Sequence, residues 1–503
     1  MLSIYVKREY LQGVTEVIQT VDRLDELVNI SDLEVKKDNK EALIVDNTGL
    51  RISIDWADNT PPYLIAPIPF TPDNLLACIF FKLHNLEAAW NYFDDESILK
   101  KHFAVMDLLQ DGYYVNEEII SFVIDDNSYA EFGAYFSKHN GAILYHYGNF
   151  EQQHAFETVK ALYDFAVANA PDARYKAFSI KHYAIFLLDN GLLDQAETLI
   201  RQVDLRELAD SVIRELHDVL IDVLLKKLVI PYDEFLLDEL KSLLWESIER
   251  ARAGGDTIKE GLRLLDASHV AFIDKNFAES LRYLNKAIDI FTQEDIQEFM
   301  GEALRRRGAL LLSWAQNGNP QFYKSSLESY QAALKIFTKE NAPAIFAEIH
   351  QDLGVIYTDM PVEEKKKGLM ASIANSSFQQ ALEFYAKENY PYEYARICTL
   401  YGNALCKFPP AIHTDNFEKA LFYYHNALQI RTKAYPYERA LTLLNYLEAS
   451  WNVKEEKDFN EERFNDMEAK AKEVLELVED EEIRAEAMRH LENLHELKKI
   501  IQK

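Results

Sequence analysis

ALEFYAKENYPYEYARICTLYG, the segment Ala381–Gly402, decides the fold because three other segments share its register. Two precede it, Ala287–Gly308 (AIDIFTQEDIQEFMGEALRRRG) and Ala333–Gly354 (ALKIFTKENAPAIFAEIHQDLG), and one follows it, Ala427–Leu447 (ALQIRTKAYPYERALTLLNYL). Their leading alanines lie 46, 48 and 46 residues apart. A fixed period of about 20 to 50 residues is typical of a solenoid, in which each unit buries its apolar face only against its neighbours.

Small and bulky residues within each repeat predict two helices. Gly354 and Tyr357 are three residues apart, as are Gly402 and Leu405, so each pair lies on one face of a first helix. A second helix is predicted from small, bulky and small residues at i, i+4 and i+7, where small residues allow close helix packing. The sets are Ser326, Tyr330, Ala333; Ala374, Phe378, Ala381; and Ala420, Tyr424, Ala427.

This pattern resembles the tetratricopeptide repeat, which has a small residue and an aromatic on helix A and an aromatic between small residues on helix B. Three earlier copies also match: Ala184, Leu187, Gly191, Leu193, Ala196, Ile200; Ser268, Ala271, Phe277, Ser280, Leu284, Ala287; and Ala77, Phe80, Ala89, Phe93. The resemblance covers roughly residues 70–451 and is weak over residues 96–174. It implies an all-α fold, a right-handed solenoid of helix hairpins. The residues before the solenoid are expected to form a small N-terminal α+β segment.

The later repeats are longer than the family's usual period of about 34 residues. The step between the small residues of their two helices is 18, 20 and 18 residues, against 12 from Ala184 to Ala196, which predicts a loop between the helices. Pro343, Pro391 and Pro436 predict breaks between repeats, because proline cannot continue a helix. Such long repeats resemble those beside the caspase-like CHAT peptidase domains of bacteria, although no peptidase segment is visible here.

Residues 1–66 do not follow the repeat and form the first of three predicted parts. We expect a helix from about Glu9 to Asn29, then a β-hairpin that pairs residues 42–45 with residues 50–56. The second strand alternates apolar and polar residues and follows a turn that ends in glycine. Because a two-stranded hairpin is marginal by itself, it is expected to pack on the predicted helix, on the solenoid or on a partner.

The other two predicted parts are the solenoid at residues 67–451 and a C-terminal cap at residues 452–503. The cap is expected to form two amphipathic helices with a polar outer face, as repeat arrays require at their ends. Its acidic run Glu479–Glu482 is placed at the start of the last helix, with an acidic docking tail as the alternative. The acidic run at residues 94–96 is likewise expected to begin a helix.

Charge and composition exclude several classes of partner. The net charge of −29 opposes binding to phosphate backbones, so nucleic acid is not expected as a partner. The three cysteines form no CxxC pair, which fits a reducing, cytoplasmic compartment. Met1–Tyr10 is charged and lacks the apolar core of a signal peptide, and no apolar stretch has the length of a membrane span. We expect neither export nor a membrane partner.

Catalytic and metal-binding motifs are missing from the sequence. It contains no phosphate-binding loop, dinucleotide-binding turn, zinc-protease helix or nucleophile elbow. His490 and His495 are five residues apart and point to different sides of a helix, so they do not form a metal site. Cys398 and Cys406, with His413 nearby, are predicted to be buried apolar groups or loop residues rather than ligands. The prediction is a protein that is not an enzyme and needs no cofactor or metal.

The family resemblance implies a binding surface on the helix A side chains of the groove. The clamp with which the family binds carboxyl-terminal tails needs Lys and Asn in successive units, and only Asn403 and the arginines approach it here. The candidate groove residues are His269, Arg305, Gln351, Arg396, Thr399, Asn403 and Trp451, with Phe272, Glu302, Thr358 and Glu448 as neighbours.

Three functions are compatible with these features. The first is a scaffold or adaptor that binds a peptide or protein in a concave groove. The second is a regulatory protein that senses a small peptide by closing its solenoid. The third is a noncatalytic subunit of a bacterial defence or peptidase complex, in which residues 1–66 join the partner's active site.

Overall fold

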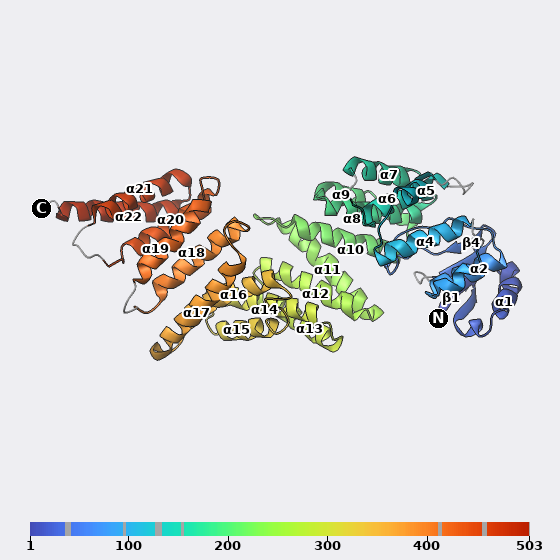
Figure 1. Ribbon diagram of the computed structural model, residues 1–503, viewed down its shortest axis with the longest axis horizontal. Helices are drawn as coiled ribbons and strands as arrows, with labels where there is room; N and C mark the ends of the chain where they lie inside the picture. Colours follow the sequence, from blue (N-terminus) through green and yellow to red (C-terminus); the bar gives the residue numbers. More distant parts are fainter. Residues whose placement is uncertain are drawn as a thin grey trace. The chain divides into compact units, whose positions relative to one another are not determined.

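The computed structural model describes residues 1–35, 42–93, 97–125, 133–151, 155–410, 415–454 and 460–501. These residues form 22 α-helices and four β-strands (Figure 1). Contacts within the chain divide it into two compact units, Met1–Ser247 and Ile248–Lys503. The three-part division at residues 66 and 451 stays a prediction.

Unit 1 begins with a four-stranded sheet of order β2-β1-β3-β4. β1 (Leu2–Val6) is parallel to both β2 (Val28–Asp32) and β3 (Ala42–Asp46), and β3 is antiparallel to β4 (Gly49–Ile52). The predicted hairpin is present as β3 and β4, but its second strand ends at Ile52 instead of residue 56. The carboxylate of Asp55 accepts hydrogen bonds from the N–H groups of nearby residues at 3.1 and 2.9 Å, which turns the chain away from the sheet.

The helix predicted from about Glu9 to Asn29 is wrong in extent. Only α1 (Leu11–Gln19) is an α-helix, and the parallel strand β2 takes up the end of the predicted segment. Arg23 has a φ of 60°, a left-handed conformation that an α-helix does not accommodate. The sheet and α1 share one hydrophobic core with the helices that follow, so the hairpin packs on the chain's own helices.

Nine further helices of unit 1 pack mostly on their neighbours in sequence. They are α2 (Pro72–Lys82), α3 (Leu86–Trp90), α4 (Ile98–Asp111), α5 (Glu117–Asp125), α6 (Gly133–Tyr147), α7 (Phe156–Ala168), α8 (Ala173–Asp189), α9 (Leu193–Arg201) and α10 (Asp210–Lys227). The hairpins predicted around Ala77 and Ala184 are α2–α3 and α8–α9, and both alanines are fully buried. The acidic run at residues 94–96 and His413 lie outside the described residues.

The boundary between the two units falls inside helix α11 (Glu234–Gly254). After this helix, unit 2 consists of helix hairpins (Figure 1). The first helices, here called the A helices, are α12 (Thr257–Ile273), α14 (Gln297–Gln316), α16 (Pro343–Asp359), α18 (Pro391–Lys407) and α20 (Pro436–Ser450). Each packs on the helix that follows it: α13 (Phe277–Gln293), α15 (Phe322–Ala333), α17 (Glu364–Phe384), α19 (Asn416–Ile430) and α21 (Glu461–Leu477). Successive A helices also contact one another, and α22 (Glu481–Ile501) packs on α20 and α21.

The repeat residues occupy the centre of these hairpins. The four leading alanines have no exposed surface: Ala287, Ala333, Ala381 and Ala427. The glycines of three A helices lie against the aromatic ring of the partner helix, so closely that an added Cβ would approach the ring to between 2.5 and 2.8 Å. These pairs are Gly308 with Tyr330, Gly354 with Phe378, and Gly402 with Tyr424. The small residues thus set the spacing of the two helices, as the pattern predicts.

The extra length of the first two long repeats is mostly helical, so the loop predicted between their helices is wrong in extent. In the third repeat the predicted interruption is present, because α18 ends at Lys407 and α19 begins at Asn416. Helix α14 continues to Gln316, eight residues past Gly308, because no proline or glycine interrupts that stretch. Helix α17 already begins at Glu364, ten residues before Ala374. The breaks at the three prolines are confirmed, since these residues begin α16, α18 and α20. None of the described helices is both long and apolar enough to cross a membrane.

Candidate functional site

The seven candidate groove residues all lie on A helices or directly after one, but only two of them are well exposed. His269 and Arg396 are exposed, Arg305, Asn403 and Trp451 are partly buried, and Gln351 and Thr399 are buried. They are distributed over α12 (His269), α14 (Arg305), α16 (Gln351), α18 (Arg396, Thr399, Asn403) and the residue after α20 (Trp451). Their contacts decide which of them can meet a partner.

Arg305 is held by acidic side chains of the protein itself. Its Nε and Nη2 donate to the two carboxylate oxygens of Glu302 at 2.8 Å each, and its Nη1 lies 3.4 Å from a carboxylate oxygen of Glu348. These hydrogen bonds raise the pKa of the Arg305 guanidinium. Glu302 also accepts a bond from Arg306 at 2.6 Å. Arg305 therefore belongs to an internal ion-pair network between α14 and α16.

Three other candidates on or after α18 and α20 hydrogen-bond within the fold. The Thr399 hydroxyl donates to the Ala395 carbonyl at 3.0 Å. Asn403 accepts a bond from the Tyr424 hydroxyl at 2.7 Å, and the indole N–H of Trp451 donates to Nδ1 of a histidine on α22 at 2.9 Å. The bonds of Asn403 and Trp451 connect neighbouring helices, whereas the Thr399 bond lies within α18.

Arg396 has a different environment. It is exposed, and no hydrogen bond or ion pair links it to another side chain in the part of the chain that the structure describes. His269 is the other exposed candidate, and burial of its ring together with the charge of Arg306 lowers its pKa. Arg396 is thus the one of the seven that offers an unpaired charge.

The surroundings of Arg396 were not predicted from the sequence. The tetrapeptide Tyr-Pro-Tyr-Glu occurs at residues 390–393 and again at residues 435–438, at the starts of α18 and α20. The rings of Tyr392 and Tyr435 lie 5.9 Å apart, so the two motifs meet. Arg396 lies one turn after Tyr392 on α18, on the same face of the helix. The doubled tetrapeptide is a signal that could have identified this surface.

We call this surface the tyrosine ledge and define it as Tyr392, Arg396, Tyr435, Tyr437 and Leu441. Its tyrosines are 44%, 39% and 52% exposed in chain order, and Leu441 is 38% exposed. Leu441 lies one turn after Tyr437 on α20, so that the ledge repeats the same arrangement on two successive A helices.

A buried arginine lies beside the ledge. Arg431, at the end of α19, is 8% exposed, and its Nη1 donates to the hydroxyls of Thr399 at 3.1 Å and Thr442 at 2.7 Å. No described carboxylate forms an ion pair with it, and its Nε has no hydrogen-bond partner. Burial lowers the pKa of the Arg431 guanidinium, whereas the nearby charge of Glu438 raises it. The ledge therefore lies beside two arginines and the carboxylate of Glu438.

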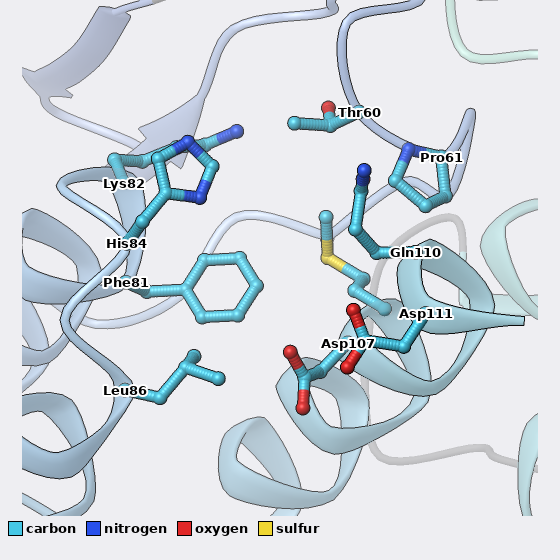
Figure 2. A pocket seen from close by; sticks show the side chains of 10 residues that line it. Thr60, Pro61, Phe81, Lys82, His84, Leu86, Asp107, Gln110 and Asp111 are labelled. Atoms are coloured by element: carbon cyan, nitrogen blue, oxygen red, sulfur yellow. The ribbon is translucent and has the colours of Figure 1, made fainter. Parts of the chain in front are cut away.

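Unit 1 contains a second candidate site, a pocket of about 300 Å³ between the end of α2 and α4 (Figure 2). Its apolar lining comes from Pro61, Phe81, Leu86 and Met106. Its polar lining comes from Thr60, Lys82, His84, Asp107, Gln110 and Asp111. The sequence reasoning missed this site, because the residues come from three segments that only the folded chain brings together.

A buried polar cluster lies near this pocket and has a structural use. Residues 55–64, here called the strap, lead from the sheet towards α2. Lys181 on α8 donates to the carbonyl oxygen of Trp56 at 2.6 Å and forms an ion pair with Asp58 at 2.7 Å. Glu215 lies 3.6 Å from the same ammonium group. Lys181 therefore fixes the strap to the helices.

Helix α6 holds the other end of the strap. Nε2 of His139 donates to the Pro62 carbonyl at 3.1 Å, so Nδ1 accepts from the Ser179 hydroxyl at 3.0 Å. Asn140 bonds the backbone N–H and carbonyl of Leu64 at 2.8 and 2.7 Å. Burial lowers the pKa of His139 to about 4, so this ring is neutral at pH 7. Within the described residues, no three His, Cys, Asp or Glu side chains are placed to hold a metal ion.

Comparison with known proteins supports the fold. No protein-family model and no curated protein sequence matches the chain. A signal transduction ATPase (STAND) protein with a tetratricopeptide repeat sensor, from Pyrococcus horikoshii, is similar at 14% identity and a TM-score of 0.50. The match covers 78% of this chain and 55% of that one, so the chain spans about half the length of that structure. This likeness shows that the chain has a tetratricopeptide-repeat fold.

Two further structures are similar at lower scores. The APC/C hetero-tetramer Cut9–Hcn1 matches at 13% identity and a TM-score of 0.33, over 84% of this chain and 72% of that one. Yeast Tom70 matches at 13% identity and a TM-score of 0.36, over 85% and 89%. These scores are too low to carry an argument. The resemblance to repeats beside bacterial CHAT peptidases stays a prediction.

Proposed function

We propose that the chain is a noncatalytic protein-interaction scaffold that binds a peptide or protein partner on the A helices of unit 2, with the tyrosine ledge at the centre of the contact. The observation that carries this proposal is the exposure of three tyrosines and an unpaired arginine on two adjacent A helices. Tyrosine and arginine are enriched at the residues that dominate protein–protein binding energy.

The ledge combines apolar area with fixed charge. A tyrosine contributes roughly 150 to 250 Å² of surface when it is fully buried, and its hydroxyl group still finds a partner at the interface. Arg396 can form paired hydrogen bonds to a carboxylate, and these are the strong ones available at such a surface. We therefore infer a partner segment with an acidic group beside apolar or aromatic side chains.

The other candidate groove residues have supporting places in this proposal. Gln351 is buried on α16 and bonds Asp352, the next residue in the chain, at 3.0 Å. Four others bond side chains of neighbouring helices, and such connections keep a binding surface rigid and lower the entropy lost on binding: Arg305, Thr399, Asn403 and Trp451. His269 on α12 is exposed and extends the proposed surface to the first hairpin of unit 2.

Peptide sensing is a second candidate function. The solved structure with the TM-score of 0.50 is described as a protein with a tetratricopeptide repeat sensor. This description supports a sensor role for the present chain, in which binding at the ledge would shift the arrangement of the hairpins. No observation favours the third hypothesis, a noncatalytic subunit of a bacterial defence or peptidase complex.

A photo-crosslinking amino acid at position 437 tests the scaffold proposal. Expressed in the source cells, the protein should crosslink one partner at the ledge, and the same probe at Phe422 serves as the matched control. Phe422 is 61% exposed on α19 but lies outside the ledge. The identified partner is then purified, and its affinity is measured by calorimetry.

The variant Tyr392→Ser with Arg396→Ala should weaken this affinity at least about a hundredfold, as expected when two hot-spot side chains are removed. Phe422→Ser should leave the affinity unchanged. Full affinity in the double variant, with a far-ultraviolet spectrum that shows intact folding, would contradict the proposal.

A further inference from the structure

The pocket in unit 1 has the size and lining of a small-molecule site. Its volume of about 300 Å³ is at the lower end of the range for ligand pockets, and such pockets combine apolar walls with a few polar groups. Phe81 extends its ring into the pocket from the end of α2 (Figure 2). Met106 is 4% exposed and closes the pocket on the side of α4. A ligand with a short apolar body would be covered by these two side chains.

Two carboxylates decide the charge of the ligand. Asp107 and Asp111 are four residues apart on α4, so both lie on the same face of the helix and line the pocket. Neither carboxylate has a hydrogen bond or ion pair with another side chain among the residues that the structure describes. Burial raises the pKa of Asp107, and the charge of Asp111 raises it further. The pocket therefore holds negative charge that a bound cation would stabilise.

The opposite side of the pocket determines how such a cation would lie. Lys82 and His84 line it at the end of α2 and in the turn that follows. Figure 2 shows the ring of Phe81 between His84 and the carboxylate of Asp107. A cationic group is attracted to the two carboxylates on α4, so the charged end of the ligand lies on that side of the pocket.

We propose that this pocket binds a small ligand that carries a primary ammonium group on a short apolar chain. The ammonium group lies between Asp107 and Asp111, and the chain lies against Phe81 and Met106. A free alkylamine and the side chain of a lysine share this chemistry. This binding does not depend on the tyrosine ledge or on the proposed scaffold function.

Calorimetry with the full-length protein tests the proposal, with n-pentylamine as the probe. 1-Pentanol and pentanoate are matched probes in which the ammonium is replaced by a neutral and a negative group. The amine should bind saturably and at least about tenfold more tightly than the alcohol, as expected when hydrogen bonds to a charged group are lost. Pentanoate should not bind.

Variants of the pocket and a surface control complete the test. Asp107→Asn and Asp111→Asn should each weaken pentylamine binding at least about tenfold, since each removes one charge. Asp25→Asn is the matched control, because Asp25 is exposed and lies outside the pocket. Thermal unfolding of each variant confirms that the protein stays folded.

Three results would overturn the proposal: no saturable binding of pentylamine, equal affinity for the amine and the alcohol, or full affinity in both pocket variants. A short peptide with one internal lysine distinguishes the two sources of the ammonium group. Competition between the peptide and pentylamine identifies a lysine side chain as the ligand, and binding of pentylamine alone identifies a free amine.

Discussion

Gly402 lies so close to the ring of Tyr424 that no other residue fits at this position without a shift of the ring. A Cβ added to Gly402 would lie 2.5 Å from Cε1 and 2.8 Å from Cζ of Tyr424. The ring is fixed in place, because its hydroxyl donates to Asn403 at 2.7 Å and its surface is 1% exposed. The contact between helices α18 and α19 therefore depends on the absence of a side chain.

Gly402→Ala should lower the free energy of unfolding by about 1 to 3 kcal/mol, the range for an overpacked core. The matched control is Gly368→Ala. Gly368 lies inside α17 and has no atom within 4 Å of its added Cβ, so alanine there should raise the free energy of unfolding by about 0.5 to 1 kcal/mol. Urea unfolding followed by circular dichroism measures both. A change of the same sign in the two variants would show that the Tyr424 ring yields easily.

The repeat was predictable because each helix hairpin depends on local residues. The small residues at Gly308, Gly354 and Gly402, and the prolines that begin the A helices, act within one hairpin or between sequence neighbours. Their spacing is therefore visible along the chain. Helix ends were less predictable. The polar and apolar residues after Gly308 are compatible with a continued helix and with a loop.

The N-terminal sheet and the two candidate sites depend on contacts between distant residues. Strand β1 pairs in parallel with β2, whose residues lie 26 positions further along, and no turn motif marks such a pairing. Arg396 belongs to a surface that is completed by residues at the start of α20. Asp107 lines a pocket whose other wall comes from α2. The family resemblance predicted the same groove position for Arg305 and Arg396. Only the structure shows that Arg305 is paired with an acidic side chain.

Arg431→Met should leave the free energy of unfolding unchanged or raise it by up to about 1 kcal/mol. The variant removes a buried charge that forms no ion pair with a carboxylate of the described residues. It leaves no hydroxyl donor unpaired, because Thr399 and Thr442 donate to backbone carbonyls at 3.0 and 2.7 Å. A loss of more than about 1 kcal/mol would show that Arg431 has a mainly structural role.

Arg439→Met is the comparison for this variant and should lower the free energy of unfolding by about 1 to 3 kcal/mol. Arg439 donates to the carbonyl oxygens of Leu428 and Arg431 at 2.9 and 2.6 Å and pairs with Glu473 at 2.7 Å. Its loss leaves carbonyls at the end of α19 without a donor and a carboxylate without a cation. Urea unfolding of both variants under identical conditions makes the comparison.

His139→Gln should reduce the dependence of stability on pH. The pKa of His139 is lowered to about 4 in the fold from its ordinary value of 6.5, so its contribution to stability is complete above pH 6.5 and is lost as the pH falls towards 4. Between pH 7 and pH 5 the unmodified protein should lose about 2 kcal/mol more than the variant. Asn140→Ala, which weakens the same strap without a titrating group, should keep the slope of the unmodified protein. Equal slopes in the His139 variant and the unmodified protein would contradict the assignment.

Arg305→Ala and Arg396→Ala should differ in stability and in binding, although both residues occupy A helices. Arg305→Ala breaks a bidentate bond to Glu302 and the contact with Glu348, and it should lower the free energy of unfolding by about 1 kcal/mol. Arg396→Ala removes no internal bond between described residues and should change the free energy of unfolding by less than about 0.5 kcal/mol.

The affinity for the partner should show the opposite pattern. Arg396→Ala should weaken it at least about tenfold, and Arg305→Ala should not. Urea unfolding and calorimetry with the partner crosslinked at position 437 measure the two effects. A larger loss of affinity in Arg305→Ala than in Arg396→Ala would move the binding surface from the tyrosine ledge to α14 and α16.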